Sequence, residues 1–207
     1  MRFRRKRPNL AEAEEWLRRG YGAVMTASDY VSVEERKQRL EKLDTDVPTM
    51  LRTELARVRS LDLVILKCHL LLEFMLNQFI DLTAPTEGAL EDARLTFKQK
   101  QAVVHMLGLP AIPLFLPSLD LLNTIRNQVA HTLAPDRGLT DKLIGMNSED
   151  PDEIQNLTDA KRVTALKQIT RFYCGMIVGV IDARHESEFH EEATEQRAPA
   201  DGAARRR

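Results

Sequence analysis

One short stretch of the chain carries side chains that could act on a phosphate group. The segment "LLNTIRNQVAHTL", residues 121–133, contains Arg126, Asn127 and His131. A guanidinium binds phosphate oxygens through paired N–H donors, and an imidazole titrates near neutral pH and can exchange a proton. These residue types raise the question of whether Arg126 and His131 are two halves of an RNA-cleaving site.

The spacing alone is weak support. With 21 arginines and 5 histidines in 207 residues, chance gives an Arg followed by a His five places later about 0.5 times. The plain alternative is a solvated helix face on which each of these residues is unremarkable.

A helical wheel separates these side chains from an apolar face formed by Leu122, Ile125, Val129 and Leu133. Measured from Asn123, Arg126 falls near about −60° and His131 near about 80°. Only Asn123, Asn127 and Ala130 lie between them. The helix therefore presents a second, polar face, with a cation and an imidazole on either side of a strip of amides.

A second polar stripe lies on the most apolar segment, residues 61–82. His69, Glu73, Asn77 and Asp81 recur every four residues and share one side of a helix. If so apolar a helix is buried, its polar stripe needs partners or a cleft. The alternative is that the stripe is the solvent side of a bundle helix.

Composition bounds the class of protein. The chain has a mass of 23.6 kDa, with 43% apolar and 29% charged residues, as in a soluble globular protein. A net charge of −1 argues against coating nucleic acid non-specifically, so any RNA contact would come from a local patch. The charged and polar residues within 61–82 argue against a membrane span, and we expect a cytoplasmic protein. Cys68 and Cys174 are expected to be buried free thiols.

The periodicity predicts an all-α fold with almost no strand. We expect four core helices, at about 48–82, 93–107, 117–133 and 159–184, forming an up-and-down bundle. Pro48 is expected in a first turn, and a capping-box pattern from Ser32 to Glu35 predicts a helical addition ending near Leu43.

The predicted organisation has three parts. Residues 1–47 form a basic tail and helical extension, 48–185 the bundle, and 186–207 a disordered charged tail. Residues 135–156 read as an exposed connection. No His, Cys, Asp or Glu cluster has metal-ligand spacing, and no phosphate-binding glycine loop is present, so neither a metal nor a cofactor is expected.

The ordered set of motifs resembles the HEPN superfamily. "IRNQVAH" is similar to its R-x4–6-H motif, with Asn127 as the polar residue after the arginine. The order "LLLEFMLNQFI", "LTFKQKQAVVHMLGL", "LDLLNTIRNQVAH" is closest in layout to the mannitol operon repressor branch. The resemblance covers about residues 50–133.

This resemblance implies a homodimer with facing motif helices and a composite, metal-independent ribonuclease site that uses no cofactor. His131 would then be the general acid or base at the RNA 2′-hydroxyl, and Arg126 would bind the scissile phosphate. Asn127 would orient His131 or the phosphate, beside Asn123. Glu73 and Asn77 would face this cleft from the neighbouring helix.

Three functions stay open at this point. The first is an endoribonuclease in a defence, stress or toxin system, with RNA as substrate and an antitoxin or regulatory protein as possible partner. Toxin-type members often carry Tyr two places after the His, where this chain has Leu133, which favours the second, a non-catalytic regulator that binds RNA or protein. The third is a helical dimerisation module with a solvated polar face.

Overall fold

Every regular element of the described chain is an α-helix, which confirms the all-α prediction. The computed structural model describes residues 33–84, 90, 93–109, 113–132, 134–149, 154 and 157–197. The helices are α2 (Val33–Leu55), α3 (Leu61–Thr83), α5 (Phe97–Met106), α6 (Phe115–Thr132), α7 (Arg137–Met146) and α8 (Asp159–Arg197). The basic tail predicted for the N-terminus and the cap at Ser32 lie outside the described residues.

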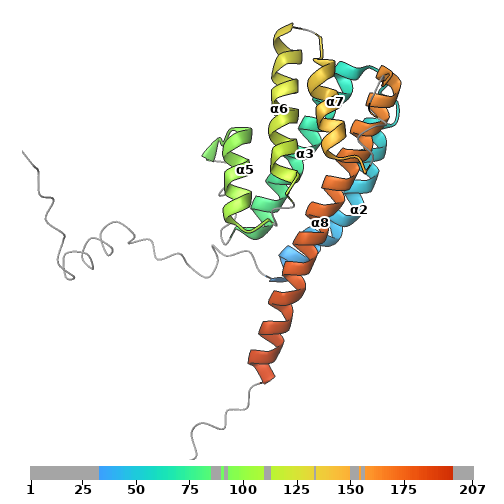
Figure 1. Cartoon of the computed structure of the whole chain (residues 1–207). Helices are drawn as coiled ribbons and strands as arrows, with labels where there is room; N and C mark the ends of the chain where they lie inside the picture. The colour runs from blue at the N-terminus through green and yellow to red at the C-terminus, as the bar shows by residue number, and fades with distance from the viewer. Residues whose placement is uncertain are drawn as a thin grey trace, which may run out of the picture.

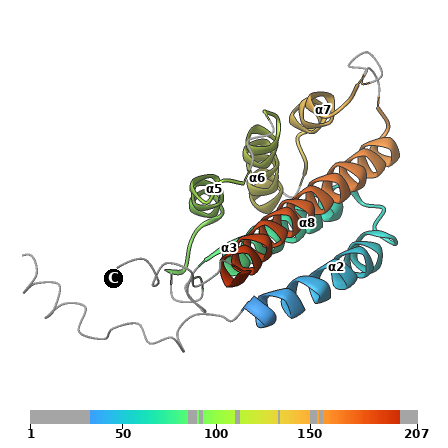
Figure 2. The same ribbon diagram turned by 90° about the horizontal axis from the view of Figure 1, so that it is seen from below.

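α3 and α8 form the middle of the bundle. They pack along each other, with α2 on one side and α5, α6 and α7 on the other (Figures 1 and 2). By length and composition alone, α3 is also the one helix among the described residues that could cross a membrane. It is contacted by four helices, α2, α5, α6 and α8, and it supplies the centre of the apolar core.

The helix predicted at 48–82 is wrong, because the structure has two antiparallel helices there. α2 ends at Leu55 and α3 begins at Leu61, with Ser60 as its extended N-cap residue. Between them Val58 folds back, bonded through its N–H to the Leu55 carbonyl, and is buried. Burial of Val58 against the core offsets the helical bonds lost at the break.

Pro48 lies inside α2 rather than in a first turn. The predicted boundary between residues 47 and 48 therefore falls within a continuous helix. Proline removes the N–H that would bond to the Asp44 carbonyl. Asp44 and Pro48 are both exposed, so water can satisfy that carbonyl and the helix continues.

The predicted exposed connection at 135–156 contains α7. Asp136 caps this helix by accepting the Leu139 N–H at 3.0 Å, and Thr140, Leu143 and Ile144 are buried. Its apolar stripe spans only ten residues, shorter than the window in which helical periodicity stands out.

The predicted end of the last helix near residue 184 is also wrong, since α8 continues to Arg197. The segment after 184 is charged, but it contains no Gly or Pro before Pro199. Glu, Gln and Arg are good helix formers, so local helix propensity favours the continuation of α8 to Arg197. The remainder of the predicted tail lies outside the described residues.

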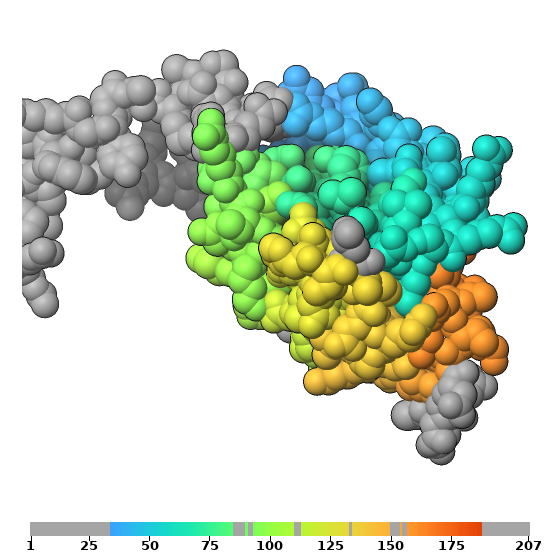
Figure 3. Space-filling model, turned by 90° about the horizontal axis from the view of Figure 1, so that it is seen from above, coloured from blue at the N-terminus to red at the C-terminus, as the bar shows by residue number. Residues whose placement is uncertain are grey.

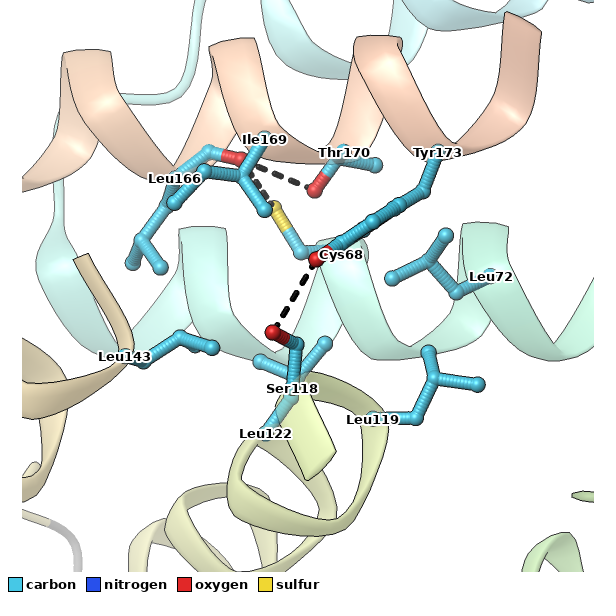
Figure 4. A pocket seen from close by; sticks show the side chains of 10 residues that line it. All are labelled: Cys68, Leu72, Ser118, Leu119, Leu122, Leu143, Leu166, Ile169, Thr170 and Tyr173. Atoms are coloured by element: carbon cyan, nitrogen blue, oxygen red, sulfur yellow. Dashed lines mark hydrogen bonds between the residues drawn. The ribbon is translucent and has the colours of Figure 1, made fainter. Parts of the chain in front are cut away.

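The centre of the core holds Cys68 beside a small buried hydrogen-bond network (Figure 4). The Tyr173 hydroxyl lies 3.0 Å from Ser118 Oγ and also bonds with Asn147 Oδ1. The void among these side chains is about 10 Å³, room for one water at most. It is a packing gap and not a ligand site.

The two cysteines are free and fully buried, as predicted. Burial raises the pKa of Cys68 to about 11 and that of Cys174 to about 12. Because the thiolate is the reactive form, we expect neither thiol to react with a colorimetric disulfide reagent at pH 8 in the native protein. Both should react once guanidinium unfolds the chain, and rapid native labelling would show instead that α3 and α8 separate readily.

Candidate functional site

α6 buries the apolar face that the sequence predicted. Leu122, Ile125 and Val129 are buried within it, whereas Leu133 lies outside the described residues. The opposite side stays open: Asn127 and His131 are exposed and Arg126 is half-buried. The two faces of the helix therefore separate core from candidate site.

Arg126 and His131 stand on different turns of α6. Arg126 Nη1 donates to Asn127 Oδ1 at 2.9 Å, which holds the guanidinium beside the amide. Five residues of helix turn His131 by about 140° from Arg126 and raise it by about 7.5 Å. The two side chains of one helix therefore start from different turns and different sides of α6.

Asn123 is joined to α3 through His69. Its Oδ1 lies 3.1 Å from His69 Nε2, so a hydrogen on Nε2 completes the bond. The ring is 2% exposed and stacks on Phe97 with 4.2 Å between ring centroids. Its Nδ1 has no hydrogen-bond partner among the described residues and lies 3.9 Å from Glu73 Oε2. Asn123 thus links α6 to α3 through its Oδ1.

Glu73 forms an ion pair with a lysine of α5. Lys100 Nζ donates to Glu73 Oε1 at 2.7 Å, and the lysine is only 11% exposed. A nearly buried ammonium requires such a partner. The sequence analysis did not identify Lys100 as a site residue, although "FKQK" places it on the polar side of α5. It also did not include His69 in the site, although His69 lies one turn before Glu73.

The structure does not bring Asn77 to Arg126. Asn77 lies two turns beyond His69 along α3, about 12 Å further. It lines a hollow of about 290 Å³ together with Phe74, Arg94 and Lys100. Glu73 and Asn77 therefore face α5, and the second half of α6 faces the first half of α3.

An exposed apolar strip lies next to the motif residues. α3 and α6 run in opposite directions (Figure 1), and His69 is opposite Asn123, so Leu66 comes opposite Arg126. Beside Leu66, Leu63 and Leu70 are 43% and 59% exposed. The C-terminal turns of α6 reach the surface next to α3 in Figure 3. We call this surface the motif face; it comprises Leu63, Leu66, Leu70, Arg126, Asn127, Ala130 and His131.

Burial lowers the pKa of His69, and the positive charges of Arg126 and Lys100 act in the same direction. The Asn123 bond and Glu73 oppose the shift. The folded protein therefore keeps this ring neutral, while the unfolded chain takes up a proton below about pH 6.5.

Since the unfolded state binds more protons, stability should fall as pH falls below about 6.5. We expect His69→Gln to flatten the dependence of Tm on pH between 7.5 and 5, measured by thermal unfolding, because the glutamine side chain has no titrating group. Its amide N–H can still donate to Asn123. An unchanged slope in the variant would assign the pH dependence to other groups.

Within the described residues, no group of three or more His, Cys, Asp or Glu side chains could hold a metal ion. In comparisons with known proteins, no family model, curated protein or solved structure matches the chain. The candidate site therefore stands on its own geometry.

Proposed function

We propose that the protein is a HEPN-type endoribonuclease whose site is completed by pairing of two motif faces. The observation that carries the proposal is the position of Arg126, Asn127 and His131 on the open side of α6. Resemblance of "IRNQVAH" to the HEPN motif supplies the reaction class.

The divergence of Arg126 and His131 supports a composite site. The two side chains point about 140° apart around the helix axis. When two α6 helices face each other, the His131 of one copy can approach the Arg126 of the other. Each substrate phosphate then meets groups from both chains.

The exposed strip of α3 supports the dimer that this site requires. Leu63 and Leu70 are large apolar side chains about half exposed to water. Burying the exposed half of each side chain against a second copy would contribute about 1 kcal/mol, roughly half of the gain from burying a fully exposed leucine. Because the strip adjoins Arg126, the same contact would bring the motif residues together.

In the proposed reaction, one His131 takes the proton of the RNA 2′-hydroxyl. The 2′-oxygen then bonds to phosphorus, and the bond to the 5′-oxygen of the next nucleotide breaks. The His131 of the second copy returns a proton to that leaving oxygen. Arg126 stabilises the charge that gathers on the phosphate, and Asn127 keeps the guanidinium in place through the 2.9 Å bond.

The contacts between α3, α5 and α6 hold the motif helix in register. The Asn123–His69 bond ties α6 to α3, and the Glu73–Lys100 pair ties α3 to α5. Neither contact uses Arg126 or His131, so both remain available for substrate.

The test is incubation of purified protein with labelled RNA in EDTA at pH 6–8. Cleavage that leaves 2′,3′-cyclic phosphate ends is expected, because the proposed acid and base are imidazoles. Binding without cleavage across varied RNAs would favour a non-catalytic regulator with the same face. An antitoxin or regulatory protein that covers the motif face should compete with RNA for it.

A further inference from the structure

A second surface lies on the far side of the bundle, between α2 and α8 (Figure 2). It is a groove of about 630 Å³ whose floor contains Val47, Leu51 and Val178. Gly175 and Gly179 keep the α8 side open, since a Cβ added at either would meet nothing within 4 Å. The groove can therefore admit the side chains of another helix.

The charges along this groove are arranged with opposite signs at its two ends. Arg52 and Arg171 line one end, and Asp44 and Asp182 line the other. Neither arginine has an ion-pair partner within the described part of the chain. The groove thus has a basic end and an acidic end, separated by the glycines.

Like charges gather at the acidic end of the groove. Burial raises the pKa of Asp182, and the carboxylates of Asp44 and Glu186 raise it further, with His185 opposing. A cation brought to this end would relieve the repulsion. The basic end of the same groove has the charge that fits.

We infer that a second copy of this chain docks in the α2–α8 groove, with the two α8 helices antiparallel about a two-fold axis between Gly175 and Gly179. An axis between these glycines lies near residue 177. Residues equally far before and after 177 then face each other, so Arg171 of one copy lies opposite residue 183 of the other copy, next to that copy's Asp182. The symmetry places the basic end of each groove on the acidic end of the other. A two-fold interface requires this self-complementary pattern.

This association does not depend on the proposed function, because α2 and the motif helix α6 lie on opposite sides of the layer formed by α3 and α8 (Figure 2). To separate the two surfaces, the experiment uses the full chain carrying Leu70→Asp, which places a charge in the motif face. Any remaining self-association then reports on the α2–α8 groove, whether or not the motif face pairs.

The test is sedimentation velocity and light scattering of four further variants in that background, up to about 100 µM protein. Asp182→Arg and Arg171→Asp should each weaken dimerisation about 10-fold or more, because like charges then meet across the interface. The double reversal should restore dimerisation. Gly179→Leu should abolish it by filling the groove.

Lys161→Glu is the matched control on α8, since Lys161 is exposed and outside the groove, and it should leave dimerisation unchanged. Arg171 is exposed and Asp182 half-buried, so folding should persist in each single reversal, as circular dichroism can verify. A chain that stays monomeric in the Leu70→Asp background would overturn the inference. A double reversal that dimerises no more strongly than either single reversal would also overturn it.

Discussion

His131→Ala is expected to lower the rate of RNA cleavage by about 10²-fold or more. A positioned acid–base group contributes at least this factor, and the imidazole has no substitute nearby on α6. Single-turnover cleavage of a labelled RNA measures the effect at saturating protein. Arg126→Ala should lose a similar amount, because charge on the phosphate would go uncompensated.

The two variants should still fold, which makes the loss of rate interpretable. His131 is exposed and Arg126 half-buried, and surface substitutions usually change stability by less than about 0.5 kcal/mol. His105→Ala is the matched control, because His105 is an exposed histidine on α5 outside the motif face. His190→Ala should also be silent. Equal rates for wild type and His131→Ala would exclude the mechanism.

Phe79→Ala should destabilise the protein by about 3–5 kcal/mol, the usual cost of deleting a buried aromatic side chain and leaving a cavity. Phe79 is 0% exposed in the core, with the Arg184 guanidinium over its ring at 5.4 Å. For a chain of this length, each kcal/mol lowers Tm by about 2–4 °C. Thermal unfolding should therefore show a fall of roughly 10 °C.

Phe74→Ala supplies the comparison on the same helix. Phe74 is 38% exposed, so truncation should cost about 1 kcal/mol or less. Circular dichroism melts of both variants at the same protein concentration measure the difference. If the two substitutions cost the same, Phe79 does not occupy the core position described above.

The buried and open faces of α6 were predictable from sequence because they lie on one helix. The 3.6-residue period fixes which side chains share a face, and the strong apolar stripe of α6 fixes which face is buried. Leu122, Ile125 and Val129 are indeed in the core and Asn127 and His131 in solvent. What the pattern cannot give is the partner of each polar group, so His69 as the partner of Asn123 and Lys100 as the partner of Glu73 came only from the packed helices.

By itself the sequence determined the all-α class and the apolar faces, because these follow from local periodicity and from a nearly complete lack of strand patterns. Tertiary structure decided where helices break. α2 and α3 separate at residues 56–60 because the chain buries Val58 and Leu61 by turning back, a gain that exists only once the bundle forms. α7 persists because Leu143 and Ile144 are buried; an isolated helix of ten residues is marginal in water. Local propensity limits which secondary structures a segment can form, and burial against other segments decides which of them it adopts in the folded protein.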